Sequence, residues 1–218
     1  MQYEPETRTV GAWLAAAALL LIAALALHPP PETGTEAFMD QIAAEGSTWI
    51  VAHGLAAAAL ASFVVAGLLG LTAAGDGLTR SAFGIMVGGA SLTLVTAVAE
   101  ATVVATAAAD GDLATFTTWD AFAGGMSMGF VGLALGVAGI AFGALRRESP
   151  VPRWSARMAT GASVVAAAAW ILGTGVGVTG ASPVWLVTSL VSSAWLVWYG
   201  IASVRKGTSV THRRVTHA

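Results

Sequence analysis

Three ionisable side chains, His53, Glu100 and Asp120, lie well inside apolar segments of this chain of 218 residues. A charge at the centre of a membrane helix costs about 2.5–3.5 kcal/mol on insertion scales, so such residues usually face a partner, water or a ligand. Carboxylates supply negative charge, and a neutral imidazole supplies a lone pair. These residue types therefore predict one polar site that could bind a proton, a cation or a small ligand.

The three side chains are expected at similar depths in the outer half of a membrane. Glu100 precedes the outer end of its segment by about nine residues, which corresponds to roughly 13 Å at the helical rise. His53 and Asp120 follow the outer ends of their segments by about five residues, or roughly 8 Å. Since consecutive helices are often neighbours, we predict that the three side chains form one connected cluster.

Three further residues are candidates for contacts within this site. Trp49 lies one helical turn before His53 on the same face, and Thr96 lies one turn before Glu100, where its hydroxyl could donate to the carboxylate. Trp170 lies deep in the outer half of its segment, and its side chain could line the same site. In a purely structural alternative, the charged residues satisfy one another and only set the register of the helices.

A cofactor at this site is an open alternative. One histidine with two carboxylates matches, by residue type, the facial triad that holds a divalent metal ion. A haem held by two histidines would need a partner for His53, and His28 is the candidate on the outer side. Neither pattern is specific. We therefore predict no cofactor and no catalytic residue, and assign no metal ion to the site. A metal ion or a haem stays open as an alternative.

Regularly spaced glycines mark the fourth apolar segment. Their spacings of four and three residues place them on one stripe of a helix. Small residues at such spacings let two helix backbones approach closely, which favours helix association in lipid. We call this stripe the glycine seam and expect it to pack against a neighbouring helix of the same chain or against a partner, with Gly84 and Gly88 as a complementary patch. The seam consists of Gly125, Gly129, Gly132, Gly136, Gly139 and Gly143.

The elements that carry these residues are six apolar segments. The chain is 56% hydrophobic and 10% charged, whereas soluble domains carry about 25% charged residues. It has no cysteine, which excludes disulfides, thiolate metal sites and thiol catalysis. The sequence predicts an all-α bundle of six membrane-spanning helices over residues 1–204, followed by a basic tail over residues 205–218. The expected segments are Val10–Leu27, Thr48–Ala73, Ser81–Ala109, Phe116–Leu145, Trp154 to a glycine-rich exit at Gly173–Gly180, and Pro183–Val204.

Loop charges predict the orientation of this bundle. With both termini in the cytoplasm, all ten Lys and Arg residues lie on the inner side. The charged residues of the outer loops are then all acidic, for example Glu36 and Asp112. The first segment could instead be a signal peptide, since Ala24-Leu25-Ala26 resembles a cleavage site, but Glu4 and Glu6 before it are unlike a positive n-region. We therefore expect a multi-pass protein of the cytoplasmic membrane. Its partners would be the lipid bilayer, which the basic tail contacts, and a homo-oligomer or membrane protein partner at the seam, with no nucleic acid.

The chain resembles a broad group of uncharacterised six-helix prokaryotic integral membrane proteins. The resemblance rests on His28-Pro29-Pro30, Trp49-x-x-x-His53, Glu100, Asp120 and Pro152-Arg153-Trp154. It implies six helices and an outer polar cluster, and it implies no activity.

Three functions are compatible with these observations. The first is binding, transport or sensing of a small ligand or cation at His53, Glu100 and Asp120. The second is a structural or assembly subunit that packs through the glycine seam. The third is a membrane redox or metal-dependent enzyme.

Overall fold

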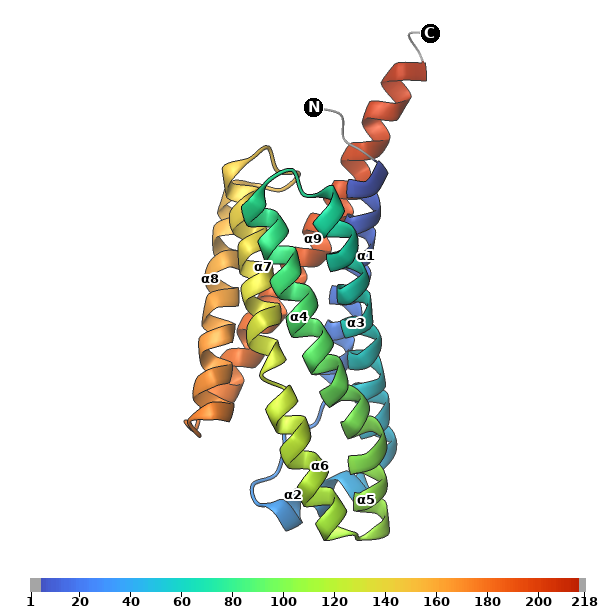
Figure 1. Ribbon diagram of the computed structural model, residues 1–218, viewed down its shortest axis with the longest axis vertical. Coiled ribbons are helices and arrows are strands. Elements are labelled where there is room, and N and C mark those ends of the chain that lie inside the picture. The colour runs from blue at the N-terminus through green and yellow to red at the C-terminus, as the bar shows by residue number, and fades with distance from the viewer. Residues whose placement is uncertain (1–4, 216–218) are drawn as a thin grey trace.

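The computed structural model describes residues 5–215 of the chain, and the side chains of residues 7–206, as helices joined by short connections (Figure 1). No strand occurs among these residues. Nine α-helices and two π-helices are described: α1 (Pro5–Leu27), α2 (Thr35–Ala44), α3 (Gly46–Ala73), α4 (Gly77–Ala99), η1 (Glu100–Val104), α5 (Ala105–Asp110), α6 (Leu113–Met126), α7 (Gly129–Arg146), α8 (Arg153–Trp170), η2 (Ile171–Gly175) and α9 (Ala181–Val215).

Six of the helical segments are long and apolar enough to cross a membrane, which confirms the predicted number of long apolar helices. Most expected boundaries are close to the observed ones, and the largest difference is at the end of the last helix, expected at Val204 and observed at Val215. Large apolar side chains such as Leu92, Phe142 and Val165 point outward and are exposed. An outward-facing apolar surface of this kind is suited to lipid. Both termini lie at the same end of the bundle (Figure 1).

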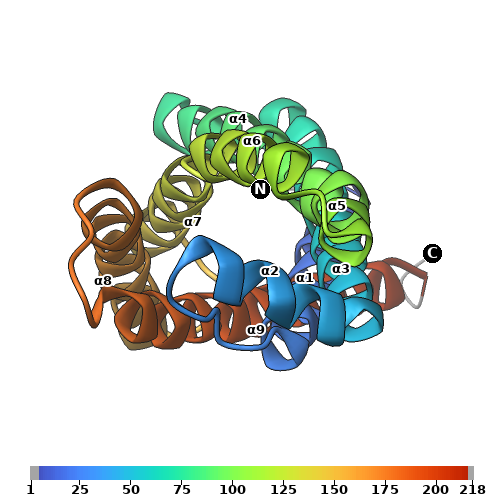
Figure 2. The same ribbon diagram turned by 90° about the horizontal axis from the view of Figure 1, so that it is seen from below.

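The six long segments form a closed ring in chain order. Contacts join α1 to α3, α3 to α4, α4 to α7, α7 to α8 and α8 to α9, and α9 returns to α1 (Figure 2). Gly11 and Gly200 lie at the closing contact, where a Cβ on Gly11 would lie 2.9 Å from the Gly200 carbonyl oxygen. Because two glycines meet there, the backbones of the first and last long helices can touch. The first segment, considered above as a signal peptide, is thus one wall of the ring.

An aspartate side chain caps the first turn of each of two helices. The Asp76 carboxylate accepts a hydrogen bond from the Thr79 N–H (3.0 Å) at the start of α4, and Asp112 accepts one from the Thr115 N–H (3.1 Å) at the start of α6. The hydroxyl and N–H of Thr115 lower the pKa of Asp112. Arg147, which follows α7, forms an ion pair with Asp76 and ties two connections together at the end of the bundle where the termini lie.

The region between the first two spans, expected to be a loop, contains the short helix α2. It packs against α5, α6 and the start of α3 and covers the end of the bundle opposite the termini (Figure 2). A small apolar core lies beneath it and includes Ile42, Trp49, Val104 and Phe116, all at most 2% exposed. We call α2, α5 and the first part of α6 the outer cap, since the sequence predicts that this end faces outward. It extends the protein beyond the hairpin that joins α8 to α9 (Figure 1).

The cap changes the depth expected for Glu100. The continuous helical segments Gly77–Asp110 and Leu113–Arg146 have 34 residues each, or about 50 Å, against a hydrocarbon core of about 30 Å. Residues from Arg80 to Glu100 span roughly 30 Å at this rise. If the hydrocarbon begins at Arg80, Glu100 would lie close to its opposite boundary, which is shallower than the roughly 13 Å expected from the sequence.

The glycine seam packs within the chain, against α4. Gly136 lies over Met86, and a Cβ there would be 2.6 Å from the Met86 Cβ; a Cβ on Gly139 would be 2.6 Å from the Ala82 Cβ. Gly129, Gly132 and Gly143 also face α4. The backbones of α4 and α7 touch because none of these positions carries a side chain.

Two details of the expected seam differ from the structure. Gly125 has no atom within 4 Å of an added Cβ, because the fourth span is interrupted at Ser127 and Met128 and the part before the break has a different course. The complementary glycine on the third span is Gly89, which meets Gly129 and Gly132, and not Gly84 or Gly88.

Candidate functional site

Trp49 is the centre of a polar and aromatic cluster under the outer cap. Its side chain is 2% exposed. Its ring centre lies 4.5 Å from that of His53, 4.8 Å from that of His28 and 5.4 Å from that of Phe38. Residues from the end of α1, from α2 and from α3 therefore meet around one indole. We call this set, with Glu100 and Asp120, the outer cluster.

The histidines His28 and His53 lie against each other, with ring centres 5.0 Å apart and planes at 65°. The Nδ1 atom of His53 is 3.0 Å from the Trp49 carbonyl oxygen, and Nδ1 of His28 is 2.7 Å from the Pro29 carbonyl oxygen. A carbonyl oxygen only accepts, so Nδ1 carries the hydrogen on both rings and Nε2 is an acceptor when the ring is neutral. Burial disfavours the imidazolium form of His28 and lowers its pKa.

Glu100 is buried and interacts with Trp49. It is 7% exposed and is the first residue of the π-helix η1, a type of helix often found at functional sites. Its Oε2 atom has no hydrogen-bond partner among the described residues, and neither has the Trp49 indole N–H. The two groups interact, although no hydrogen bond of standard geometry joins them. Among the described residues, Trp49 is the only donor that interacts with this carboxyl group, and its geometry is poor, so lone pairs of Glu100 remain for a ligand.

Asp120 brings a second carboxyl group to Glu100. It belongs to α6, is partly exposed, and lies close enough to act electrostatically on Glu100. No ion pair joins His53 to either carboxyl group among the described residues; Trp49 contacts His53 and also interacts with Glu100. No group of three His, Asp or Glu side chains in the described part of the chain could hold a metal ion together, so the facial triad considered above is not assembled.

Two expected members of the site lie elsewhere. The Thr96 hydroxyl donates to the Ala123 carbonyl oxygen (2.9 Å) and links α4 to α6, where we had expected it to donate to Glu100. Trp170 packs on Phe130 and Trp185, with ring centres 4.8 and 4.5 Å away, on the far side of the ring. Helical periodicity gives the face of each residue but not which neighbour lies opposite it.

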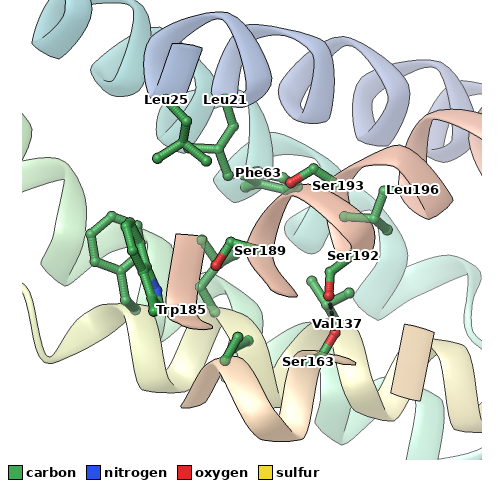
Figure 3. A pocket seen from close by; sticks show the side chains of 14 residues that line it. Leu21, Leu25, Phe63, Val137, Ser163, Trp185, Ser189, Ser192, Ser193 and Leu196 are labelled. Atoms are coloured by element: carbon green, nitrogen blue, oxygen red, sulfur yellow. Dashed lines mark hydrogen bonds between the residues drawn. The ribbon is translucent and has the colours of Figure 1, made fainter. Parts of the chain in front are cut away.

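The described residues also line a small pocket inside the ring, beside the Trp185 ring (Figure 3). Its volume is about 40 Å³, enough for two or three water molecules. Its polar side chains are four serines and Trp185, and Ser163 donates to the Ser192 hydroxyl (2.9 Å) across α8 and α9. No charged side chain lines it, so it offers little to a cation, in contrast to the outer cluster.

His28 is the member of the outer cluster that residue spacing alone does not place there. The sequence offers it as a second haem ligand near the interface and, in His28-Pro29-Pro30, as part of the resemblance to six-helix membrane proteins. The available signal was the proline run that follows it: the Gln41 side chain donates to the Pro30 carbonyl oxygen (3.0 Å) and accepts from the Glu32 N–H (2.9 Å), and thereby holds this run against α2.

Neither a protein-family model, nor a curated protein, nor a solved structure matches this chain. The resemblance to six-helix prokaryotic membrane proteins therefore stays a prediction. The outer cluster is the feature of this chain that supports a function.

Proposed function

We propose that this chain is a multi-pass protein of the cytoplasmic membrane that binds a cation from the outer side, as a sensor or transport component. The observation that carries the proposal is the carboxyl pair of Glu100 and Asp120, in which the buried carboxyl group makes no hydrogen bond of standard geometry. Two neighbouring carboxylates in a partly desolvated site repel each other, and a bound cation or proton relieves that repulsion.

The surroundings of the pair favour access from outside. Asp120 is partly exposed, whereas Glu100 is covered by the protein. Near the outer boundary of the hydrocarbon, an ion can reach Asp120 from water before it contacts Glu100. The acidic residues around the cap, among them Glu32, Glu36 and Asp40, would raise the local concentration of cations.

The alternative functions find less support in the arrangement. Five glycines of the seam face α4 of the same chain, so an assembly role would need another surface. A haem plane must lie between its two axial imidazoles, but the rings of His28 and His53 contact each other and leave no space for one.

Replacement of the buried carboxylate is the direct test of cation binding. The purified protein should be unfolded by heat in detergent with Zn²⁺, Mn²⁺ or Ca²⁺. A cation at 100 times its Kd should stabilise the wild type by about 2.7 kcal/mol. We expect Glu100→Gln to lower the affinity for that cation at least about ten-fold, because one charge-assisted contact is lost.

Glu36→Gln is the matched control, since Glu36 is an exposed acidic residue of the same cap. We expect it to change the affinity less than about two-fold, because exposed charges are well screened. If none of the three ions stabilises the wild type, or if Glu100→Gln and Asp120→Asn both bind as tightly as the wild type, the proposal is wrong.

The orientation in the membrane is tested by single cysteines, since the chain has none of its own. We expect a membrane-impermeant thiol reagent to label Glu36→Cys in intact cells and to label Glu148→Cys only after the cells are opened. Both residues are exposed, and they lie at opposite ends of the bundle. The reverse pattern would place the outer cluster on the cytoplasmic side.

A further inference from the structure

We infer that His28 and His53 are two ligands of one divalent transition-metal ion of the borderline class, such as Zn²⁺, Cu²⁺ or Ni²⁺. This inference rests on the proposed function, because it names the class of cation that the outer cluster binds. It uses different atoms from the carboxyl pair, so the two can be tested separately.

The orientation of the two rings is the first argument. The Nδ1 atom of each ring donates to a backbone carbonyl oxygen, and the nitrogen–oxygen distance is 2.7 Å for His28 and 3.0 Å for His53. Metal-binding histidines typically donate their second ring nitrogen in this way, which sets the tautomer and the direction of the ligating lone pair. Both Nε2 atoms remain without a hydrogen-bond partner among the described side chains and backbone groups. Imidazole nitrogen is a preferred ligand of Zn²⁺, Cu²⁺ and Ni²⁺.

The spacing of the rings is the second argument. A metal–nitrogen bond of about 2.0–2.1 Å places each ring centre about 3 Å from the ion. Two imidazoles at a tetrahedral angle on one ion then have ring centres about 5 Å apart. The ring centres of His28 and His53 are 5.0 Å apart, a spacing compatible with two neighbouring ligands of one ion.

The support around the pair is the third argument. His53 is fixed within α3 against Trp49. His28 follows α1, and the three prolines after it restrict its backbone. Gln41 holds this proline run to α2 through two hydrogen bonds. Both ligands are therefore positioned before an ion arrives, which lowers the entropic cost of binding.

The coordination would be incomplete within the protein. Since no third His, Asp or Glu in the described part of the chain joins these two, the other positions on the ion would be filled by water. An open site of this kind exchanges its ion more readily than a closed structural site. Glu100 and Asp120, which belong to the same cluster, would offset part of the positive charge.

Cu²⁺ binding, followed by electron paramagnetic resonance, counts the nitrogen ligands directly. The experiment uses the full chain with His212→Gln and His217→Gln, so that His28 and His53 are the only histidines left. We expect one tightly bound Cu²⁺ with hyperfine splitting from two nitrogens. His28→Gln and His53→Gln should each reduce the count to one and weaken Zn²⁺ binding at least about ten-fold. Size-exclusion profiles and unfolding temperatures show whether each variant is folded.

The outcomes separate this inference from the proposed function. Splitting from fewer than two nitrogens in the chain that retains both histidines overturns the inference, whatever the variants do. Zn²⁺ or Ca²⁺ binding that depends on Glu100 but is unchanged in both histidine variants also overturns it and leaves the proposed function standing. Binding that depends on the histidines and not on Glu100 or Asp120 supports the pair and rejects the role of the carboxylates.

Discussion

Gly136→Leu is expected to destabilise the protein by about 3 kcal/mol or more, and to do so by separating α4 from α7. The added side chain would begin 2.6 Å from the Met86 Cβ and 2.7 Å from its backbone nitrogen. Backbone atoms cannot rotate away, so the two helices must move apart along their whole contact. Loss of this contact would also open the ring, because α4 and α7 are consecutive members of it.

Gly125→Leu is the matched control for this substitution. Gly125 belongs to the same stripe of the sequence, but no atom lies within 4 Å of a Cβ added there. We expect it to change the free energy of unfolding by less than about 0.5 kcal/mol. Thermal unfolding and size-exclusion chromatography in detergent measure both variants. Equal losses would mean that the seam acts as one continuous surface, contrary to the break at Ser127 and Met128.

Trp49→Ala is expected to cost about 3–5 kcal/mol and to abolish cation binding at the outer cluster. The indole is nearly fully buried and contacts His28, Phe38 and His53, so its removal leaves a large cavity under α2. It also removes the surface against which both imidazoles pack. Stability and ion affinity should therefore fall together.

Trp119→Ala tests whether this effect belongs to the site and not to tryptophan in general. Trp119 lies on α6 of the same cap, is 38% exposed, and packs mainly on Phe122. We expect a loss below about 1 kcal/mol and unchanged ion affinity. Unfolding temperatures with and without Zn²⁺ provide both quantities. A Trp49→Ala protein that still binds Zn²⁺ with wild-type affinity would show that the indole does not organise the cluster.

Much of the fold follows from composition and periodicity. Six apolar segments, each about long enough to span a bilayer, could only become helices, since a membrane leaves no other way to satisfy backbone groups within one segment. The same segments carried His53, Glu100 and Asp120, and their rarity in apolar sequence identified them as candidates. Spacing within a helix also predicted that the seam glycines from Gly129 to Gly143 share a face.

Tertiary structure decided which residues of neighbouring helices contact each other. The sequence by itself determined the number of apolar helices, the stripe of the seam, and the candidate residues of the site. Periodicity specifies a face but not the neighbour, so only the fold placed Gly89 on the seam, Thr96 on Ala123 and Trp170 on Trp185. It also placed His28 beside His53, because that contact depends on how α2 folds back over the end of the bundle and on where α1 stands in the ring. Such contacts join residues distant in the chain, and no local propensity encodes them.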